Sequence, residues 1–334
     1  GIHGASKIRR VTDMCHATLK PALGAKADVS VWRTVTVISI WSVLASPAKG
    51  FADGLDRSDG FSAGIKTKRN APTILNTAFN GIELEGNLDP KKSPQFYDNR
   101  AHSLEEQCMG PLLSADEMKG SDLSIESHIR QIEQEVMGIM EYRSLFFRAF
   151  SDSTVSIDRI TKAIATYERT LITPNAPFDL YMRGDRNAMT EEQVKGMEAF
   201  IETGCNNCHS GPMFSDYELH VLGVEDHPGL DNYDEGAGNY AFRTTTLRNL
   251  AYTAPYMHNG RLSSLEEVMN FYAVKRSKHP KVSSRDLAPE FKDLKLNPFN
   301  RSRIKSIIAF LEALNDPDFD QSIPKRVPSE FSIE

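Results

Sequence analysis

The chain has 334 residues, of which about a quarter are charged, and its formal net charge is −6 at pH 7. This length suggests about two domains, each large enough to bury a core, and the acidic balance argues against a nucleic-acid partner. Four cysteines are too few for a disulfide framework in a chain of this size.

Residues 1–45 differ in character from the rest of the chain. They hold an isolated Cys15-His16 pair and an apolar run over residues 35–45 that follows Arg33. The run is too short to span a membrane as a helix. Its basic start and small-residue end resemble a signal peptide placed inside the numbering.

Helical periodicity dominates the remainder of the chain. Ser103 with Glu106, and Thr190 with Gln193, form capping-box patterns that predict helix starts. Apolar residues at 3.6-residue spacing predict four longer helices. Their stripes are Ile129, Ile132, Val136 and Met140; Ile157, Ile160, Ile164, Tyr167 and Leu171; Val194, Met197, Phe200 and Ile201; and Ile304, Ile307, Ile308, Leu311 and Leu314. No run of strands is evident, so the predicted fold class is all-α.

Two segments lack this periodicity. Residues 172–188 contain Pro174, Pro177 and Gly184 and are predicted to form a linker. Residues 210–242 form a long Gly- and Asp-rich loop, and a loop of that length in a compact domain usually borders a site.

The third predicted helix ends in Cys205-Asn206-Asn207-Cys208-His209. This C-x-x-C-H motif is typical of c-type haem attachment. Two thiols at this spacing can add to the two vinyl groups of one porphyrin, and the adjacent imidazole can bind the iron. A zinc or redox CxxC is the alternative, but the chain has no second CxxC and no His pair at zinc-finger spacing. Since haem is attached covalently outside the cytoplasm, we expect an exported, periplasmic protein.

Several segments together resemble the bacterial di-haem cytochrome c peroxidase family, including its MauG-type branch. The matching stretches, within residues 46–314, are SPAKGFADG (46–54), RNAPTILN (69–76), QFYDNRAHSLEEQCMGPL (95–112), AIATYERTLITPNAPFD (163–179), GCNNCHSGPMFSD (204–216) and TTLRNLAYTAPYMHNGRLSSLEEVMNFY (245–272). The resemblance implies two cytochrome c-like domains that face each other, with long loops and little or no β structure. They would be a peroxidatic domain over residues 46–172 and a domain over residues 173–322 that carries CxxCH.

The resemblance also implies an activity. We expect a c-type haem oxidoreductase that reduces hydrogen peroxide, with electrons from a small donor protein such as a c-type cytochrome or a cupredoxin. The MauG-type alternative is peroxide-driven oxidation of a partner protein. Members of the family often pair, so a homodimer is expected.

Four residues match family positions near the two irons. Gln107 and Glu117 match the polar pair over the open iron face, where Glu117 would move a proton between the peroxide oxygens. Tyr97 stands where the family usually has a bridging tryptophan, and Arg248 resembles a haem-propionate partner. The alternative explanation is that Gln107 and Glu117 are ordinary polar residues on a helix surface and that Arg248 forms a surface ion pair.

The opposite axial ligand of the CxxCH haem is a Met in peroxidases of this family and a Tyr in the MauG branch. A capping box at Ser264 predicts a helix that places Leu265, Val268, Met269 and Tyr272 on one face. The family position falls on Tyr272. Met269 is the runner-up, and Met257 is third.

A calcium ion lies between the haems in this family. The resemblance assigns its protein oxygens to Asn70, Thr253 and Pro255, which offer the amide and carbonyl oxygens that calcium prefers. Turn chemistry is the alternative explanation of these residues.

The chain departs from the family before residue 46, where a first C-x-x-C-H is expected. Trp41-Ser42-Val43-Leu44-Ala45 offers neither thiol nor imidazole. We therefore interpret residues 1–45 as an atypical N-terminus, signal-like or produced by a shifted reading frame. The same departure supports an alternative function, a mono-haem electron-transfer protein with a vestigial first haem domain.

Overall fold

The computed structural model describes residues 49–321 and 328, with the exception of residue 61. The interpretation of residues 1–45 therefore lies outside the described residues. The helices are α3 (Leu104–Leu113), α4 (Ile125–Gly138), α5 (Met140–Phe150), α6 (Ile157–Glu168), α7 (Pro177–Arg183), α8 (Glu191–Thr203), α9 (Leu265–Val274), α10 (Pro289–Lys292) and α11 (Arg301–Glu312). Short 3-10 turns are η2 (Thr77–Phe79), η3 (Cys205–Asn207) and η4 (Leu250–Tyr252).

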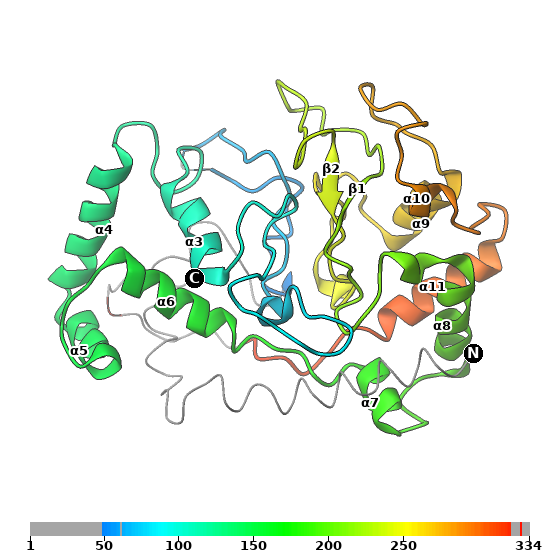
Figure 1. Ribbon diagram of the computed structural model, residues 1–334, viewed down its shortest axis with the longest axis horizontal. Coiled ribbons are helices and arrows are strands. Elements are labelled where there is room, and N and C mark those ends of the chain that lie inside the picture. The colour runs from blue at the N-terminus through cyan, green and yellow to red at the C-terminus, as the bar shows by residue number, and fades with distance from the viewer. Residues whose placement is uncertain (1–48, 61, 322–327, 329–334) are drawn as a thin grey trace.

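The helices fall into two groups on opposite sides of the molecule (Figure 1). We call α3–α6 the N-terminal side and α8–α11 the C-terminal side. Each side has its own hydrophobic cluster, formed around Tyr142, Phe146 and Ile164 on the N-terminal side and around Phe200, Ile307 and Phe310 on the C-terminal side. None of the helices among the described residues is long and apolar enough to cross a membrane.

The N-terminal side confirms two predicted helices and corrects one. Ser103 accepts a hydrogen bond from the backbone N–H of Glu106 and caps α3, as the capping pattern predicts. The stripe predicted to run on to Met140 is interrupted, because α4 ends at Gly138 and Ile139 is extended. Met140 begins α5 and is 75% exposed. The glycine explains the break, since it is a poor helix former.

The C-terminal side is built on the pair α8 and α11. Thr190 and Gln193 form the predicted capping box at the start of α8. Gly196 lies where the two helices cross, and a Cβ added there would collide with the backbone carbonyl of Ser306. The segment predicted as a linker holds the short helix α7, which starts at Pro177 because proline is well suited to the first helical position.

The described part of the chain is mostly helical, as predicted, and it contains one small antiparallel sheet. β1 (Leu219–Val221) pairs with β2 (Ala241–Arg243), with Leu219 opposite Arg243. It stands between the two helix groups (Figure 1). Three-residue strands are too short for alternation to be visible in the sequence, which is why the sequence predicts a loop over residues 210–242.

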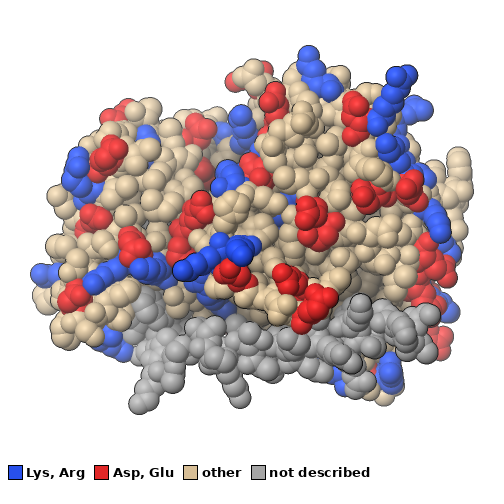
Figure 2. All heavy atoms as spheres, viewed as in Figure 1, with Lys and Arg blue, Asp and Glu red and all other residues tan. Residues whose placement is uncertain are grey.

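In the view of Figure 2, basic and acidic side chains are interspersed over the visible face.

Candidate functional site

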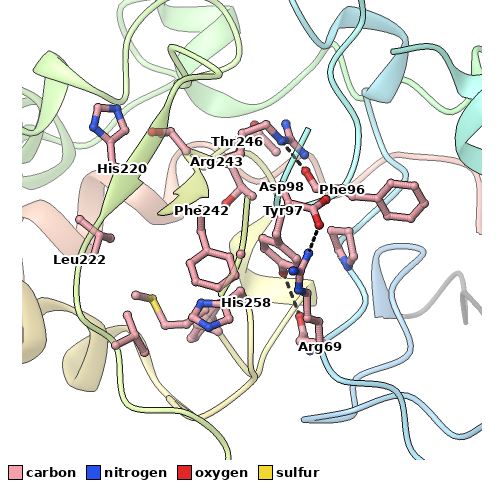
Figure 3. A pocket seen from close by; sticks show the side chains of 18 of the residues that line it. Arg69, Phe96, Tyr97, Asp98, His220, Leu222, Phe242, Arg243, Thr246 and His258 are labelled. Carbon is pink, nitrogen blue, oxygen red and sulfur yellow. Dashed lines mark hydrogen bonds and ion pairs between the residues drawn. The ribbon is translucent and has the colours of Figure 1, made fainter. Parts of the chain in front are cut away.

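A cavity of about 790 Å³ is lined by residues of both sides. Every site residue predicted from the sequence lies on its wall, although these residues are up to 202 positions apart, from Asn70 to Tyr272. They are Asn70, Tyr97, Gln107, Glu117, Cys205, Cys208, His209, Arg248, Thr253, Pro255, Met269 and Tyr272, with Met257 and His258 beside them. Figure 3 shows part of this wall around Tyr97 and His258.

The end of α8 places the two thiols and the imidazole. Gly204 takes a left-handed conformation that ends the helix, and η3 follows at once with Cys205. The backbone N–H of His209 donates to the Cys205 carbonyl at 3.0 Å. Its Nδ1 donates to the Phe214 carbonyl at 2.9 Å, which leaves Nε2 as the ligand nitrogen. Burial lowers the pKa of His209, so the ring is neutral and suited to bind iron.

The cavity residues around this motif fit a c-type haem. Two thiols and an oriented neutral imidazole meet at one wall, and the walls nearby are formed by apolar side chains from α8, α9, α10 and α11. These include Phe200, Leu265, Phe291, Ile307 and Leu311. Burial raises the pKa of Cys205 to about 12, as expected for a thiol in largely apolar surroundings. Cys205, Cys208 and His209 would hold the haem.

Helix α9 supplies the candidates for the opposite ligand. Its predicted face, Leu265, Val268, Met269 and Tyr272, lines the cavity throughout. Burial is the main cause of the raised pKa of Tyr272, and Tyr272 packs against the same hydrophobic cluster as Cys205. Met269 is 5% exposed and packs into the hydrophobic cluster of the C-terminal side.

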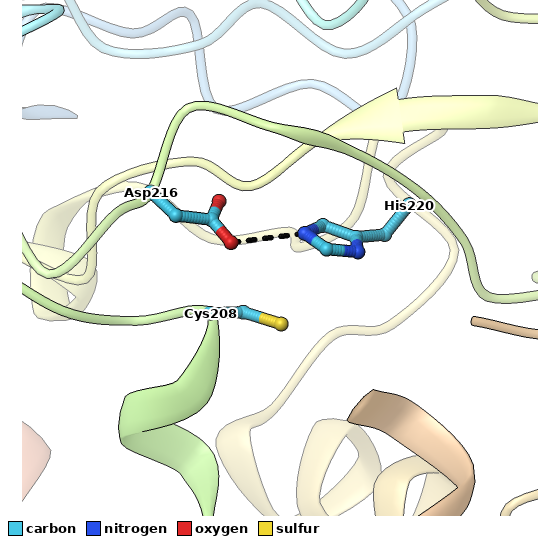
Figure 4. Close-up of side chains that lie close together, drawn as sticks. All are labelled: Cys208, Asp216 and His220. Carbon is cyan, nitrogen blue, oxygen red and sulfur yellow. Dashed lines mark hydrogen bonds and ion pairs between the residues drawn. The ribbon is translucent and has the colours of Figure 1, made fainter. Parts of the chain in front are cut away.

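Sequence reasoning missed an Asp216–His220 pair beside Cys208. The three ligand-type atoms of Cys208, Asp216 and His220 lie within 4.8 Å of one another (Figure 4). The Nε2 of His220 donates to Asp216 at 2.9 Å, and this hydrogen bond is the main reason why the pKa of His220 rises to about 10. Because Cys208 belongs to the haem motif, we place the pair beside the attachment point and assign it no separate metal.

The N-terminal side contributes the polar part of the wall. Leu104, Gln107 and Pro111 share the cavity face of α3, and Glu117 follows in the loop after the helix. Burial raises the pKa of Glu117, so its carboxyl keeps a proton to higher pH than an exposed glutamate does. Glu168, at the end of α6, also lines the cavity and was not singled out from the sequence.

Aromatic and amide groups lie between the two sides. The Tyr97 hydroxyl donates to the side-chain oxygen of Asn70 at 3.2 Å. The His258 ring stacks on Phe242 at 3.6 Å between centroids and meets Tyr97 edge-on at 6.4 Å (Figure 3). Asn70 is 6% exposed and shares the cavity wall with Thr253 and Pro255, which are the other two predicted calcium ligands.

Three buried or half-buried arginines differ in their partners. Arg248 is held by Asp179 through two bonds of 2.8 and 2.9 Å, so its ion pair is buried rather than on the surface. Arg69 pairs with Asp234 and Asp98. Arg243 has no carboxylate partner among the described residues, and its Nε donates to the Phe96 carbonyl at 2.7 Å. No sequence pattern marked Arg243, which the short strand β2 brings to the cavity.

The fold and the site define a c-type haem protein, and comparisons with known proteins specify its family. Residues 46–187 match the family model of di-haem cytochrome c peroxidase. Cytochrome c551 peroxidase of Nitrosomonas europaea is 32% identical over 271 residues, which cover 78% of this chain and 69% of the relative. The chain belongs to the di-haem cytochrome c peroxidase family, and it is an oxidoreductase of the haem peroxidase and MauG type.

Other similar proteins come from both branches. The methylamine utilization protein MauG of Methylorubrum extorquens is 33% identical over 279 residues, covering 80% of this chain and 70% of the relative. A crystal structure of a MauG-like protein associated with microbial copper homeostasis superposes with a TM-score of 0.70 at 25% identity, covering 86% of this chain and 89% of that one. The diheme peroxidase BthA of Burkholderia thailandensis shares the fold, with a TM-score of 0.67 at 19% identity over 87% of each chain.

Proposed function

We propose that this protein reduces hydrogen peroxide in the cavity between its two sides, with electrons that enter through a haem at Cys205, Cys208 and His209. The observation that carries the proposal is that one cavity joins this attachment site to the polar wall of Gln107 and Glu117. A bound haem supplies redox-active iron. Tyr97, between the two sides, is in a position to relay the electrons. Peroxide-driven oxidation of a partner protein uses the same site.

The residues of the polar wall have separate tasks in this proposal. Burial raises the pKa of Glu117, so its carboxylate is a stronger base than that of an exposed glutamate and can take a proton from one peroxide oxygen and give it to the other. The Gln107 amide can donate a hydrogen bond to the bound peroxide and orient it. The apolar walls exclude bulk water and strengthen both interactions.

Tyr272 is the proposed ligand opposite His209. The assignment is supported by the position of Tyr272 on the cavity wall, on the face of α9 that matches the family's ligand position. A phenolate favours the oxidised states of iron, and a thioether favours the ferrous state. We expect Tyr272→Phe to change the low-spin visible spectrum and Met269→Leu to leave it unchanged. The reverse pattern would assign the ligand to Met269.

Further parts of the proposal follow from the family. Oxygens of Asn70, Thr253 and Pro255 are proposed to bind calcium between the haem sites, because they are hard donors on one wall. Arg248 is proposed to position a haem propionate while Asp179 holds it. Arg243 is a second candidate, since a buried guanidinium without a carboxylate favours an anionic ligand.

The setting of the protein is proposed on the same basis. We place the peroxidatic domain at residues 46–172 and the CxxCH domain at residues 173–322, and we propose that the protein works in the periplasm. A c-type cytochrome, a cupredoxin or an oxidisable protein is the proposed partner, and the active form is a homodimer.

A mono-haem electron-transfer protein is the second candidate function. The relatives named cytochrome c peroxidase and MauG do not favour it. Haem stoichiometry by pyridine haemochrome, together with peroxide turnover, separates the two functions. Two haems and turnover would establish the peroxidase, whereas one haem without turnover would leave electron transfer.

A further inference from the structure

A carboxyl group that the proposed function does not use lies on the core-facing side of α6. Glu168 follows Ile160 and Ile164 at helical spacing and is 3% exposed, so it occupies the next position of their apolar stripe. A glutamate is rarely buried to this extent unless it is paired. Glu168 also lies on the cavity wall, together with Leu104 and Gln107 of α3.

No charged partner compensates for the burial of Glu168. Its Oε2 has no hydrogen-bond partner, and it forms no ion pair within the described part of the chain. The adjacent Arg169 is held by Glu105 of α3 through two bonds of 2.8 Å. The nearby Cys108 is a buried thiol whose pKa is raised by desolvation, so it carries no charge.

These surroundings favour the protonated form of Glu168. Burial raises its pKa to about 8, the negative charge of Glu105 acts in the same direction, and the positive charge of Arg169 only partly opposes them. At pH 7 the group is therefore a neutral carboxylic acid at the wall of the cavity. Unlike Glu117 in its loop, it is fixed at the end of a helix.

We propose that Glu168 is the proton store for peroxide reduction in this cavity, a role that rests on the proposed peroxidase function. Reduction of one H₂O₂ breaks its O–O bond and needs two protons and two electrons, and the reduced donor protein supplies the electrons. The O–H bond of Glu168 breaks, and its proton passes through water in the cavity to one peroxide oxygen; the second proton comes from solvent to the other oxygen, so that both oxygens leave as water. The carboxylate then regains a proton from solvent.

The test uses Glu168→Gln, which keeps the size of the side chain but holds no transferable proton. In the haem-loaded chain we expect peroxide turnover to fall about tenfold or more below pH 8. The loss of activity near pH 8 in the parent should disappear from the variant. An infrared carbonyl band of a protonated carboxyl at pH 7 should be present in the parent and absent from Glu168→Gln.

Two further variants test the direction of the pH shift and provide a control. Glu105→Gln removes a nearby negative charge and releases Arg169, so we expect the alkaline limb of the pH profile to move to lower pH. Glu135→Gln, on an exposed face of α4, should change neither the profile nor the infrared band.

The outcomes distinguish this proposal from the proposed function. If the parent turns over peroxide and Glu168→Gln matches its rate and pH profile, the proton store is excluded while the peroxidase stands. If the infrared band is missing from the parent, the protonated carboxyl itself is excluded. A parent that carries haem but reduces no peroxide would overturn both.

Discussion

The two sides of the cavity are built in different ways. On the C-terminal side the groups that would hold the haem are neighbours in sequence, Cys205, Cys208 and His209, and the end of one helix places them. On the N-terminal side the acidic groups come from separate elements, with Glu117 in a loop and Glu168 at the end of α6. The groups proposed to attach haem are thus placed locally, whereas the placement of the groups proposed to handle protons depends on how α3 packs against α6.

The largest expected effect is the loss of covalent haem from the C-terminal side, where neighbouring residues form the attachment motif. Replacement of Cys205 and Cys208 by serine should reduce covalently bound haem at this site to background, because serine forms no thioether. Intact mass and pyridine haemochrome measure it. Cys108→Ser, outside the cavity wall, should keep the haem. Unchanged covalent haem in the double variant would place the attachment elsewhere.

The next effect tests the N-terminal side. Glu117→Gln should lower peroxide turnover by roughly a hundredfold to ten-thousandfold, because it removes the group proposed to move a proton between the peroxide oxygens. Stopped-flow kinetics measure it at constant haem content. Glu85→Gln, in an exposed loop, serves as the control. A rate within twofold of the parent would remove Glu117 from the chemistry.

A third prediction concerns the buried ion pair between Arg248 and Asp179. Asp179→Asn leaves the Arg248 guanidinium buried without its carboxylate, so we expect a loss of about 3–5 kcal/mol in the free energy of unfolding. Urea denaturation measures it. Asp152→Asn, which removes the exposed partner of Arg159, should have no measurable effect. Equal losses in the two variants would contradict the difference in burial.

The smallest expected effect is a change in how the free energy of unfolding depends on pH. The pKa of Glu168 is raised in the folded state from its ordinary 4.5 to about 8. Its contribution to stability is therefore fully present below pH 4.5 and is lost as pH rises through about 8. We expect Glu168→Gln to flatten the stability profile in this window. Identical profiles for the variant and the parent would show that Glu168 ionises normally.

Local signals predicted the C-terminal side well. The capping boxes at Thr190 and Ser264 mark real helix starts, and the predicted face of α9 lines the cavity. Such features depend on residues three or four apart, so the sequence contains them directly. The roles of the site residues remain predictions.

The features that the sequence did not predict are formed by residues that lie far apart in the chain. The sheet joins residues about twenty positions apart through strands of three residues. The position of Arg243 beside the Phe96 carbonyl, and that of His220 beside Asp216 and Cys208, arise only when the long loop folds back. Glu168 did carry a signal, a carboxylate in an apolar stripe, but its burial is decided by the packing of α3.

The close crossing at Gly196 has a consequence for engineering this protein. Because α8 runs from that crossing to Thr203, two residues before Cys205, a side chain that pushes α8 away from α11 would also displace Cys205 and Cys208. A methyl group at residue 196 could therefore impair maturation of the cytochrome although it lies outside the cavity wall.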